Sequence, residues 1–135
     1  GFGDPAAGIC FRLMPDGRLR SGMCKTSGDD IVPDSDLSGP LDPDRWYHLV
    51  LAWDFHRRIE GSDTMRLYLD GRIVFRTQAT RDTLWPYKRV QTHANFMLGA
   101  QGYNSRYEDS FNGVLDEFKV YDGALTEAEV KALVK

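Results

Sequence analysis

The sequence lacks two features that would point to a membrane or a nucleic-acid partner. Its longest apolar run, around residues 49–53, is far shorter than the roughly 20 residues that span a bilayer. Its 17 lysines and arginines are outnumbered by 20 aspartates and glutamates, which gives a net charge of −3. Binding to a nucleic-acid backbone requires a basic excess that this chain does not have. We therefore expect no membrane span and no nucleic-acid partner.

Cysteine is also scarce, with two residues in 135. Cys10 and Cys24 lie on opposite arms of an expected hairpin and share strand parity, so both belong to one face of it. The sequence predicts a disulfide, which requires that the two residues pair directly with Cβ atoms about 4 Å apart. A register shifted by two residues would place Cys10 opposite Gly22 and leave two free thiols. A bridge would indicate an oxidising compartment.

Strand and turn signals are abundant in this chain. With 41% hydrophobic and 12% aromatic residues, it has enough apolar surface for the core of one domain. The triplet Pro15-Asp16-Gly17 interrupts one alternating stretch, and Asp70-Gly71 separates two apolar runs. Glycine takes the positive φ that such turns require, and Asp-Gly is a strong signal for a type I′ hairpin turn. The sequence predicts two β-hairpins here.

A further strand is predicted at residues 46–54, "WYHLVLAWD", because apolar and polar residues alternate. One face is the predicted core and carries Tyr47, Leu49, Leu51 and Trp53. The other carries Trp46, His48 and, on the next strand, Tyr68, which either line an open surface or are covered by another segment. More strands are expected at residues 95–98 and 114–121. The spacing indicates an all-β fold, an antiparallel β-sandwich.

The chain is predicted to finish with a short helix. Thr126 followed three residues later by Glu129 is a capping box, in which each side chain accepts a hydrogen bond from the other residue's amide. The helix should span residues 127–134, with Val130, Leu133 and Val134 forming its apolar face. We expect this face to pack against the sandwich.

Four stretches in this order resemble the successive motifs of the laminin-G-like, concanavalin A-like jelly-roll family. They are "WYHLVLAWD", "LYLDGRIV", "FMLGAQG" and "FNGVLDEFKVYDGALTEAEV". The resemblance implies a single domain over residues 1–135 that lacks the first strand or strands of the family, so that an upstream domain or a partner chain would complete the sheet. It also implies a secreted or cell-surface protein, extracellular or periplasmic, that binds glycans or extracellular proteins.

Asp116 is the candidate metal ligand. Its parity matches that of Val114, Phe118 and Val120, so its carboxylate is expected near the core end of the last strand, where it needs a partner. In related jelly-roll sandwiches the acid at this place often contributes to a calcium site, so the resemblance implies calcium as a cofactor. Calcium takes about six to eight oxygen ligands. The alternative is that Asp116 simply accepts backbone amides.

A ligand surface is predicted in two loops, residues 84–89 and 101–110. Aromatic rings cover the apolar face of a sugar, while amide, guanidinium and hydroxyl groups fix its hydroxyls. The alternative is that these rings cover the edge of the sandwich. The candidates are Trp85, Tyr87, Tyr103, Asn104, Arg106 and Tyr107.

Catalysis is not expected. Sandwich glycosidases place two carboxylates across a cleft, and their Glu-x-Asp-x-x-Glu strand is absent, since Glu60, Asp63 and Asp70 do not fit it. The sequence therefore favours a non-catalytic glycan-binding or adhesive module attached to a larger protein. A structural domain that pairs with another chain through open sheet edges is the second hypothesis, and a fragment of a glycan-active enzyme is the third. Glycan binding before and after Trp85→Ala separates the first two.

Overall fold

The computed structural model describes residues 8–24, 38–54, 59–78, 98–99, 101–103, 106–108 and 110–134. For residues 8–12, 20–24, 101–103 and 106–108 the description covers the backbone. The chain divides into two compact units, Gly1–Val90 with Tyr121–Lys135, and Gln91–Val120. Each unit is described below by itself.

The first predicted hairpin is confirmed. It consists of β1 (Gly8–Leu13) and β2 (Leu19–Cys24), which pair in antiparallel fashion. The turn between them contains Gly17 with a φ of 78°, a conformation that favours glycine. The Gly17 carbonyl accepts a hydrogen bond from the amide of Leu41 at 2.8 Å, which ties the turn to the following segment.

The register of this hairpin differs from the one that the disulfide prediction required. Cys10 stands opposite Gly22, and Cys24 stands opposite Gly8, so the two cysteines are offset by two residues. Diagonal positions of this kind are about 7–8 Å apart, well beyond the Cβ separation of a disulfide. The direct pairing of Cys10 with Cys24 was therefore wrong. The bridge itself stays a prediction, because the side chains of both cysteines lie outside the described part.

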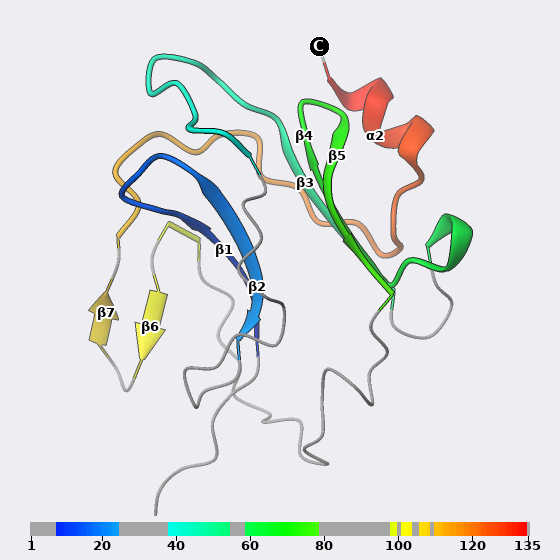
Figure 1. Ribbon diagram of the computed structural model, residues 1–135, viewed down its shortest axis with the longest axis horizontal. Coiled ribbons are helices and arrows are strands. Elements are labelled where there is room, and N and C mark those ends of the chain that lie inside the picture. Colours follow the sequence, from blue (N-terminus) through cyan, green and yellow to red (C-terminus); the bar gives the residue numbers. More distant parts are fainter. Residues whose placement is uncertain are drawn as a thin grey trace, which may run out of the picture. The chain divides into compact units, whose positions relative to one another are not determined.

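The second predicted hairpin is confirmed and is part of a three-stranded antiparallel sheet. The strands are β3 (Leu49–Trp53), β4 (Met65–Leu69) and β5 (Arg72–Thr77), in the order β3-β4-β5 (Figure 1). At the turn, Asp70 has a φ of 49° and Gly71 a φ of 73°. Positive φ at both central positions is what a type I′ turn requires.

Both faces of this sheet contribute to a core. On one face Leu67 packs with Leu19 of β2, and on the other Tyr68 packs with Ile59 and with Val130 near the chain's end. Tyr68 is fully buried, so of the two alternatives for its face, the covering segment is the one observed at Tyr68.

The predicted core face of β3 also needs correction. Leu49 and Trp53 are 40% and 49% exposed, whereas Ala52 on the opposite face is buried. The physical reason is that the C-terminal helix supplies apolar side chains to the Ala52 face, while β3 has a sheet neighbour on one side only within the described residues. The alternation of apolar and polar residues therefore predicted the strand correctly but predicted the wrong face as the more buried one.

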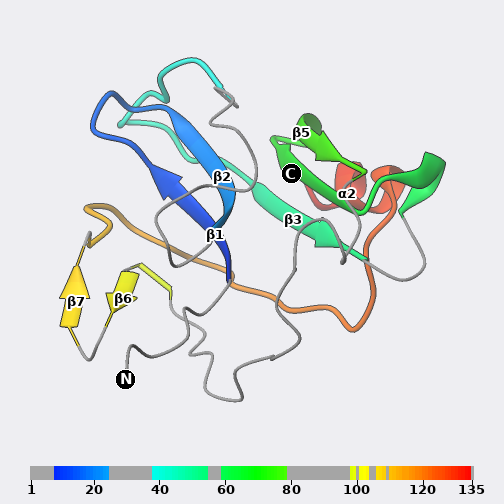
Figure 2. The same ribbon diagram turned by 60° about the horizontal axis from the view of Figure 1, so that its bottom comes forward.

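The C-terminal helix is confirmed as α2 (Glu127–Leu133), with its capping box. The Glu129 amide donates to Thr126 Oγ1 at 3.3 Å, and the Thr126 amide donates to Glu129 Oε2 at 2.8 Å. Figures 1 and 2 show α2 beside the β4–β5 hairpin, where its Val130 is fully buried. A Cβ on Gly71 would lie 3.1 Å from Val134 Cγ2, so a larger residue in this turn would press on the end of the helix.

In the second unit, β6 (Gln101–Tyr103) and β7 (Arg106–Glu108) pair as a short hairpin where a loop was expected. The strand predicted at residues 114–121 is not formed within the described residues. Glu117 has a φ of 49°, in the left-handed region, which interrupts an extended chain. Of the strand predicted at residues 95–98, Leu98 lies in a bend and the rest lies outside the described residues.

Candidate functional site

The six predicted ligand residues are only partly placed by the structure. Trp85, Tyr87 and Asn104 lie outside the described residues, and Tyr103, Arg106 and Tyr107 belong to β6 and β7. Tyr103 pairs directly with Arg106, so these two residues belong to one face of the hairpin. Tyr107 pairs with Gly102, one position along, and belongs to the other face. Tyr107 therefore belongs to the opposite face of the hairpin from Tyr103 and Arg106.

Asp116 is exposed, so its expected position near the core end of a strand was wrong. The residues that share its parity, Val114, Phe118 and Val120, are 71%, 53% and 75% exposed. Asp116 Oδ1 accepts a hydrogen bond from the Glu117 amide at 2.7 Å, as the alternative interpretation expected. Within the described ranges, no three or more His, Cys, Asp or Glu side chains gather in a way that could hold a metal. The described residues do not by themselves fit a calcium site.

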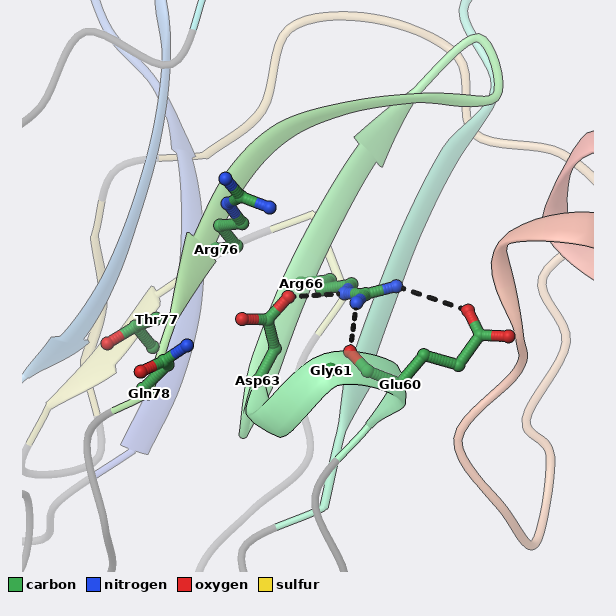
Figure 3. Close-up of a pocket in the computed structure, with 7 residues that line it drawn as sticks. All are labelled: Glu60, Gly61, Asp63, Arg66, Arg76, Thr77 and Gln78. Atoms are coloured by element: carbon green, nitrogen blue, oxygen red, sulfur yellow. Dashed lines mark hydrogen bonds and ion pairs between the residues drawn. The ribbon is translucent and has the colours of Figure 1, made fainter.

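A polar pocket of about 300 Å³ lies at the end of β5 (Figure 3). This volume is at the lower end of the range of small-ligand sites, roughly 300–1,000 Å³. None of its residues was predicted as a site residue. The lining residues are Glu60, Gly61, Asp63, Arg66, Arg76, Thr77 and Gln78.

Arg66 is the central group of this pocket. It lies on β4, a strand whose residues from Met65 to Tyr68 are all buried, and a buried charge is costly unless it is paired. Its Nε donates to Asp63 Oδ2 at 2.7 Å, and its Nη1 to Glu60 Oε2 at 3.4 Å. The side chains of Arg66 and Asp63 are 7% and 6% exposed, so this ion pair is almost fully buried.

A tight turn brings both acids to Arg66. The 3₁₀ turn η1 (Glu60–Ser62) is closed by an antiparallel β-bridge between Ile59 and Asp63. In this bridge the Ile59 amide donates to the Asp63 carbonyl at 2.5 Å. Within it, Gly61 and Ser62 have φ values of 75° and 91°, and the second costs energy because serine has a Cβ. Arg66 Nη2 donates to the Glu60 carbonyl, so the guanidinium holds the turn as well as its acids.

The network keeps Arg66 charged. Burial by itself lowers the pKa of Arg66, but the hydrogen bonds and charges of Tyr68 and Asp63 outweigh it and raise the pKa above its ordinary value. Arg66 Nη1 donates to the Tyr68 hydroxyl at 3.4 Å, which connects the pocket to the core under α2. The floor of the pocket is therefore a fixed ion-pair network.

Arg76 is the second cation of the pocket, and its situation differs. It stands directly opposite Arg66 in the β4–β5 register, so the two belong to the same face of the sheet. Like charges in such pairs repel each other. Two carboxylates compensate Arg66, but Arg76 is exposed, and no ion pair to it occurs among the described residues. Arg76 is thus the cation of the pocket that no described carboxylate pairs with.

The charges are unevenly placed around the pocket. Figure 3 shows the Glu60 carboxylate on the far side of Arg66, away from Arg76, Thr77 and Gln78. Glu60 Oε2 also accepts the amide of Glu127, the first residue of α2, at 3.4 Å. The end of β5 is fixed by the Thr77 carbonyl, which accepts the Thr64 amide at 2.8 Å. The side of the pocket near β5 therefore presents a guanidinium and an amide.

Sequence reasoning missed this site, although one signal was present. Arg66 interrupts the apolar run "MRLYL", and a charged residue in a strand buried on both faces needs a partner close by. Asp63, three residues earlier, was the nearest candidate. The glycosidase motif, with which Glu60, Asp63 and Asp70 were compared, does not indicate a contact of Glu60 and Asp63 with Arg66.

Residues 2–131 match the laminin-G-type family described as the concanavalin A-like lectin/glucanases superfamily. The chain therefore belongs to this family, and the resemblance predicted from its four motifs is confirmed. The superfamily fold is a β-sandwich, which agrees with the sheets and the short terminal helix of the described residues.

No curated protein matches the chain. Among solved structures, it is similar to an S-layer domain-containing protein (residues 221–444) from Clostridium thermocellum. The two are 18% identical with a TM-score of 0.52, and the match covers 98% of this chain and 58% of that chain. This likeness concerns the fold. The chain spans less than two thirds of that solved chain, and within the described ranges no helix has the length and apolar character needed to cross a membrane.

Proposed function

We propose that this chain is a non-catalytic glycan-binding module with a jelly-roll sandwich, attached to a larger secreted or cell-surface protein. Membership in a superfamily of lectins and glucanases supports a carbohydrate ligand. The observation that carries the proposal is the pocket at the end of β5. It combines fixed acceptors on Asp63 with donors on Arg76 and Gln78, the mixture that sugar hydroxyls require.

The geometry of the two acids argues against hydrolysis at this pocket. A glycosidase needs its carboxylates about 5–9 Å apart with the scissile bond between them. Here the Arg66 guanidinium is bonded to both Asp63 and Glu60 and occupies the space between them. An enzyme fragment would release reducing sugar from a polysaccharide, and we expect no such release.

A surface location is part of the proposal. The similar solved structure comes from an S-layer domain-containing protein, and this likeness is what supports a surface location. Surface labelling of intact cells that express the parent protein tests this part.

A second candidate function is assembly with another chain. It is favoured by a series of exposed large apolar side chains in the closing segment, since exposed apolar patches and open strand edges promote protein contacts. Sedimentation of the purified chain tests it, with a dimer expected if this function holds. The side chains are Phe111, Val114, Leu115, Phe118, Val120 and Tyr121.

A glycan array tests the proposed function. We expect the wild-type chain to bind at least one glycan, Gln78→Ala to lose that binding, and Arg72→Gln, outside the pocket on the same strand, to keep it. If Trp85→Ala loses binding while Gln78→Ala retains it, the predicted loop surface is the site and the pocket is not. A chain that binds no glycan and sediments as a dimer is an assembly domain.

A further inference from the structure

The pocket is unusual for a sugar-binding site because none of its described lining residues is aromatic. Lectin sites commonly gain affinity by covering the apolar face of a pyranose with such a ring. Without one, binding here has to come from hydrogen bonds and charge. Hydrogen bonds that involve an ionised group are roughly twice as strong as neutral ones. A ligand with a charged substituent therefore gains most from this pocket.

The sign of that charge follows from Arg66 and Arg76. Arg66 is compensated by two carboxylates and buried, whereas Arg76 is exposed with no ion pair in the described part of the chain. Asp63 is bonded to Arg66 at 2.7 Å, and Glu60 lies on the far side of it (Figure 3). The lining has two cations and two carboxylates, and both carboxylates are bonded to Arg66. Arg76 is therefore the cation to which a bound anion would pair, and that anion would also weaken the repulsion between the two arginines.

The planar shape of the guanidinium restricts which anionic groups fit the pocket. An arginine presents a planar fork of donors that matches the two oxygens of a carboxylate or a sulfate. Gln78, two residues along on the same side of the pocket, offers an amide that both donates and accepts, as a neighbouring sugar hydroxyl requires.

We propose that this pocket binds an acidic sugar, with the anionic substituent paired to Arg76 and an adjacent hydroxyl bonded to Gln78. This inference rests on the proposed glycan-binding function and deepens it. A uronic acid carboxylate is the substituent for which we argue, because it is held on the ring beside the hydroxyls that Gln78 would contact. A sulfate ester shares the same chemistry and is distinguished below.

The test is calorimetric titration of the full chain with three probes: a galacturonic acid tetrasaccharide, a galactose tetrasaccharide of the same linkage, and inorganic sulfate. A competition titration with a sulfated galactan follows. We expect the acidic tetrasaccharide to bind roughly tenfold to hundredfold more tightly than the neutral one, the ratio that one charged contact provides. Arg76→Gln should remove this preference. Arg72→Gln removes the same charge from the same strand outside the pocket and should leave the ratio unchanged.

The outcomes distinguish the preference for an acidic sugar from the proposed glycan-binding function. Equal affinity for both tetrasaccharides, unchanged in Arg76→Gln, overturns the acidic preference but leaves glycan binding intact. Binding of neither tetrasaccharide, nor of the glycans on an array, overturns the proposed function. Sulfate binding as tight as that of the acidic tetrasaccharide shows an adventitious ion only and overturns the proposal. A sulfated galactan that outcompetes the uronate assigns the site to a sulfate ester and overturns the carboxylate.

Discussion

Arg66 and Arg76 stand directly opposite each other on β4 and β5, and only Arg66 is compensated by carboxylates within the described residues. This relationship gives the two arginines different functions. Arg66 holds Asp63 and the η1 turn in place, so it belongs to the structure of the pocket. Arg76 faces solvent on the same side of the sheet and is the group that a ligand would meet first.

The first prediction concerns the buried ion pair. Arg66→Met leaves the carboxylate of Asp63 buried without its partner, and we expect the free energy of unfolding to fall by about 3 kcal/mol. Arg76→Met, which removes an exposed charge, should change it by less than about 0.5 kcal/mol. Urea unfolding of both variants measures the difference.

A double mutant separates the pair from the individual side chains. In Asp63→Asn with Arg66→Met, no buried charge is left alone, so the loss should be smaller than the sum of the two single losses. Strict additivity would mean that the contact of 2.7 Å contributes nothing to stability and that the pocket is not held by it.

The second prediction is a pH dependence of α2. Hydrogen bonds from the backbone and side chain of Thr126 lower the pKa of Glu129, and the hydrogen bond from Lys131 lowers the pKa of Glu127. A carboxyl whose pKa is lower in the folded state stabilises the fold above its unfolded pKa, about 4.3, and this stability is lost as pH falls through the folded value. The melting temperature should therefore drop below about pH 4.3.

Glu129→Gln is the matched control for this effect. Glutamine can still accept the Thr126 amide in a capping box but does not titrate. We expect Glu129→Gln to melt at a lower temperature than wild type at pH 7 and to show a shallower decline in acid. Identical acid slopes for the two proteins would contradict the assignment to Glu129.

The third prediction concerns the contact between α2 and the sheet. Val130 is fully buried beside Tyr68, Ala52 and Ile59, and Val130→Ala removes two methyl groups from that cluster. We expect a loss of about 2 kcal/mol from the lost burial and the cavity. Ala132→Ser, at an exposed position of the same helix, should cost about 0.5 kcal/mol by helix propensity. Equal losses would mean that the helix does not cover Tyr68.

Local signals in the sequence predicted the turns and the helix cap because each depends on a few neighbouring residues. Asp70-Gly71 needs positive φ at both positions, and Thr126 with Glu129 forms its cap within one turn. The buried face of β3 could not be predicted in this way. It depends on the packing of Ala52 with Val130, which lies 78 positions later in the chain. The local alternation of residues carries no information about so distant a contact.

The candidate site was not predictable from a motif for the same reason. Its parts are a turn with positive φ at Ser62, a buried arginine on β4 and the exposed end of β5. Arg66 and Arg76 meet only through the strand register, which includes an irregularity between Leu67 and Tyr68. The sequence shows the Asp-Gly turn that joins the strands but does not show the register shift.

The fourth prediction concerns calcium at Asp116. If the ion binds only the folded chain, excess chelator lowers the melting temperature by mass action. Asp116→Ala should abolish this response, whereas Asp122→Ala, at another exposed aspartate, should preserve it. A melting curve that does not change in chelator would contradict the calcium site.

We expect the pocket at the end of β5 to be the ligand-binding site. Amide chemical shifts followed by NMR, during titration with the acidic tetrasaccharide, test it most directly. We predict that the largest shifts occur at Asp63, Arg76, Thr77 and Gln78, with the shifts of Arg72 almost unchanged. Large shifts around Trp85 and Tyr87 without any at Gln78 would contradict the claim and place the ligand on the loop surface instead.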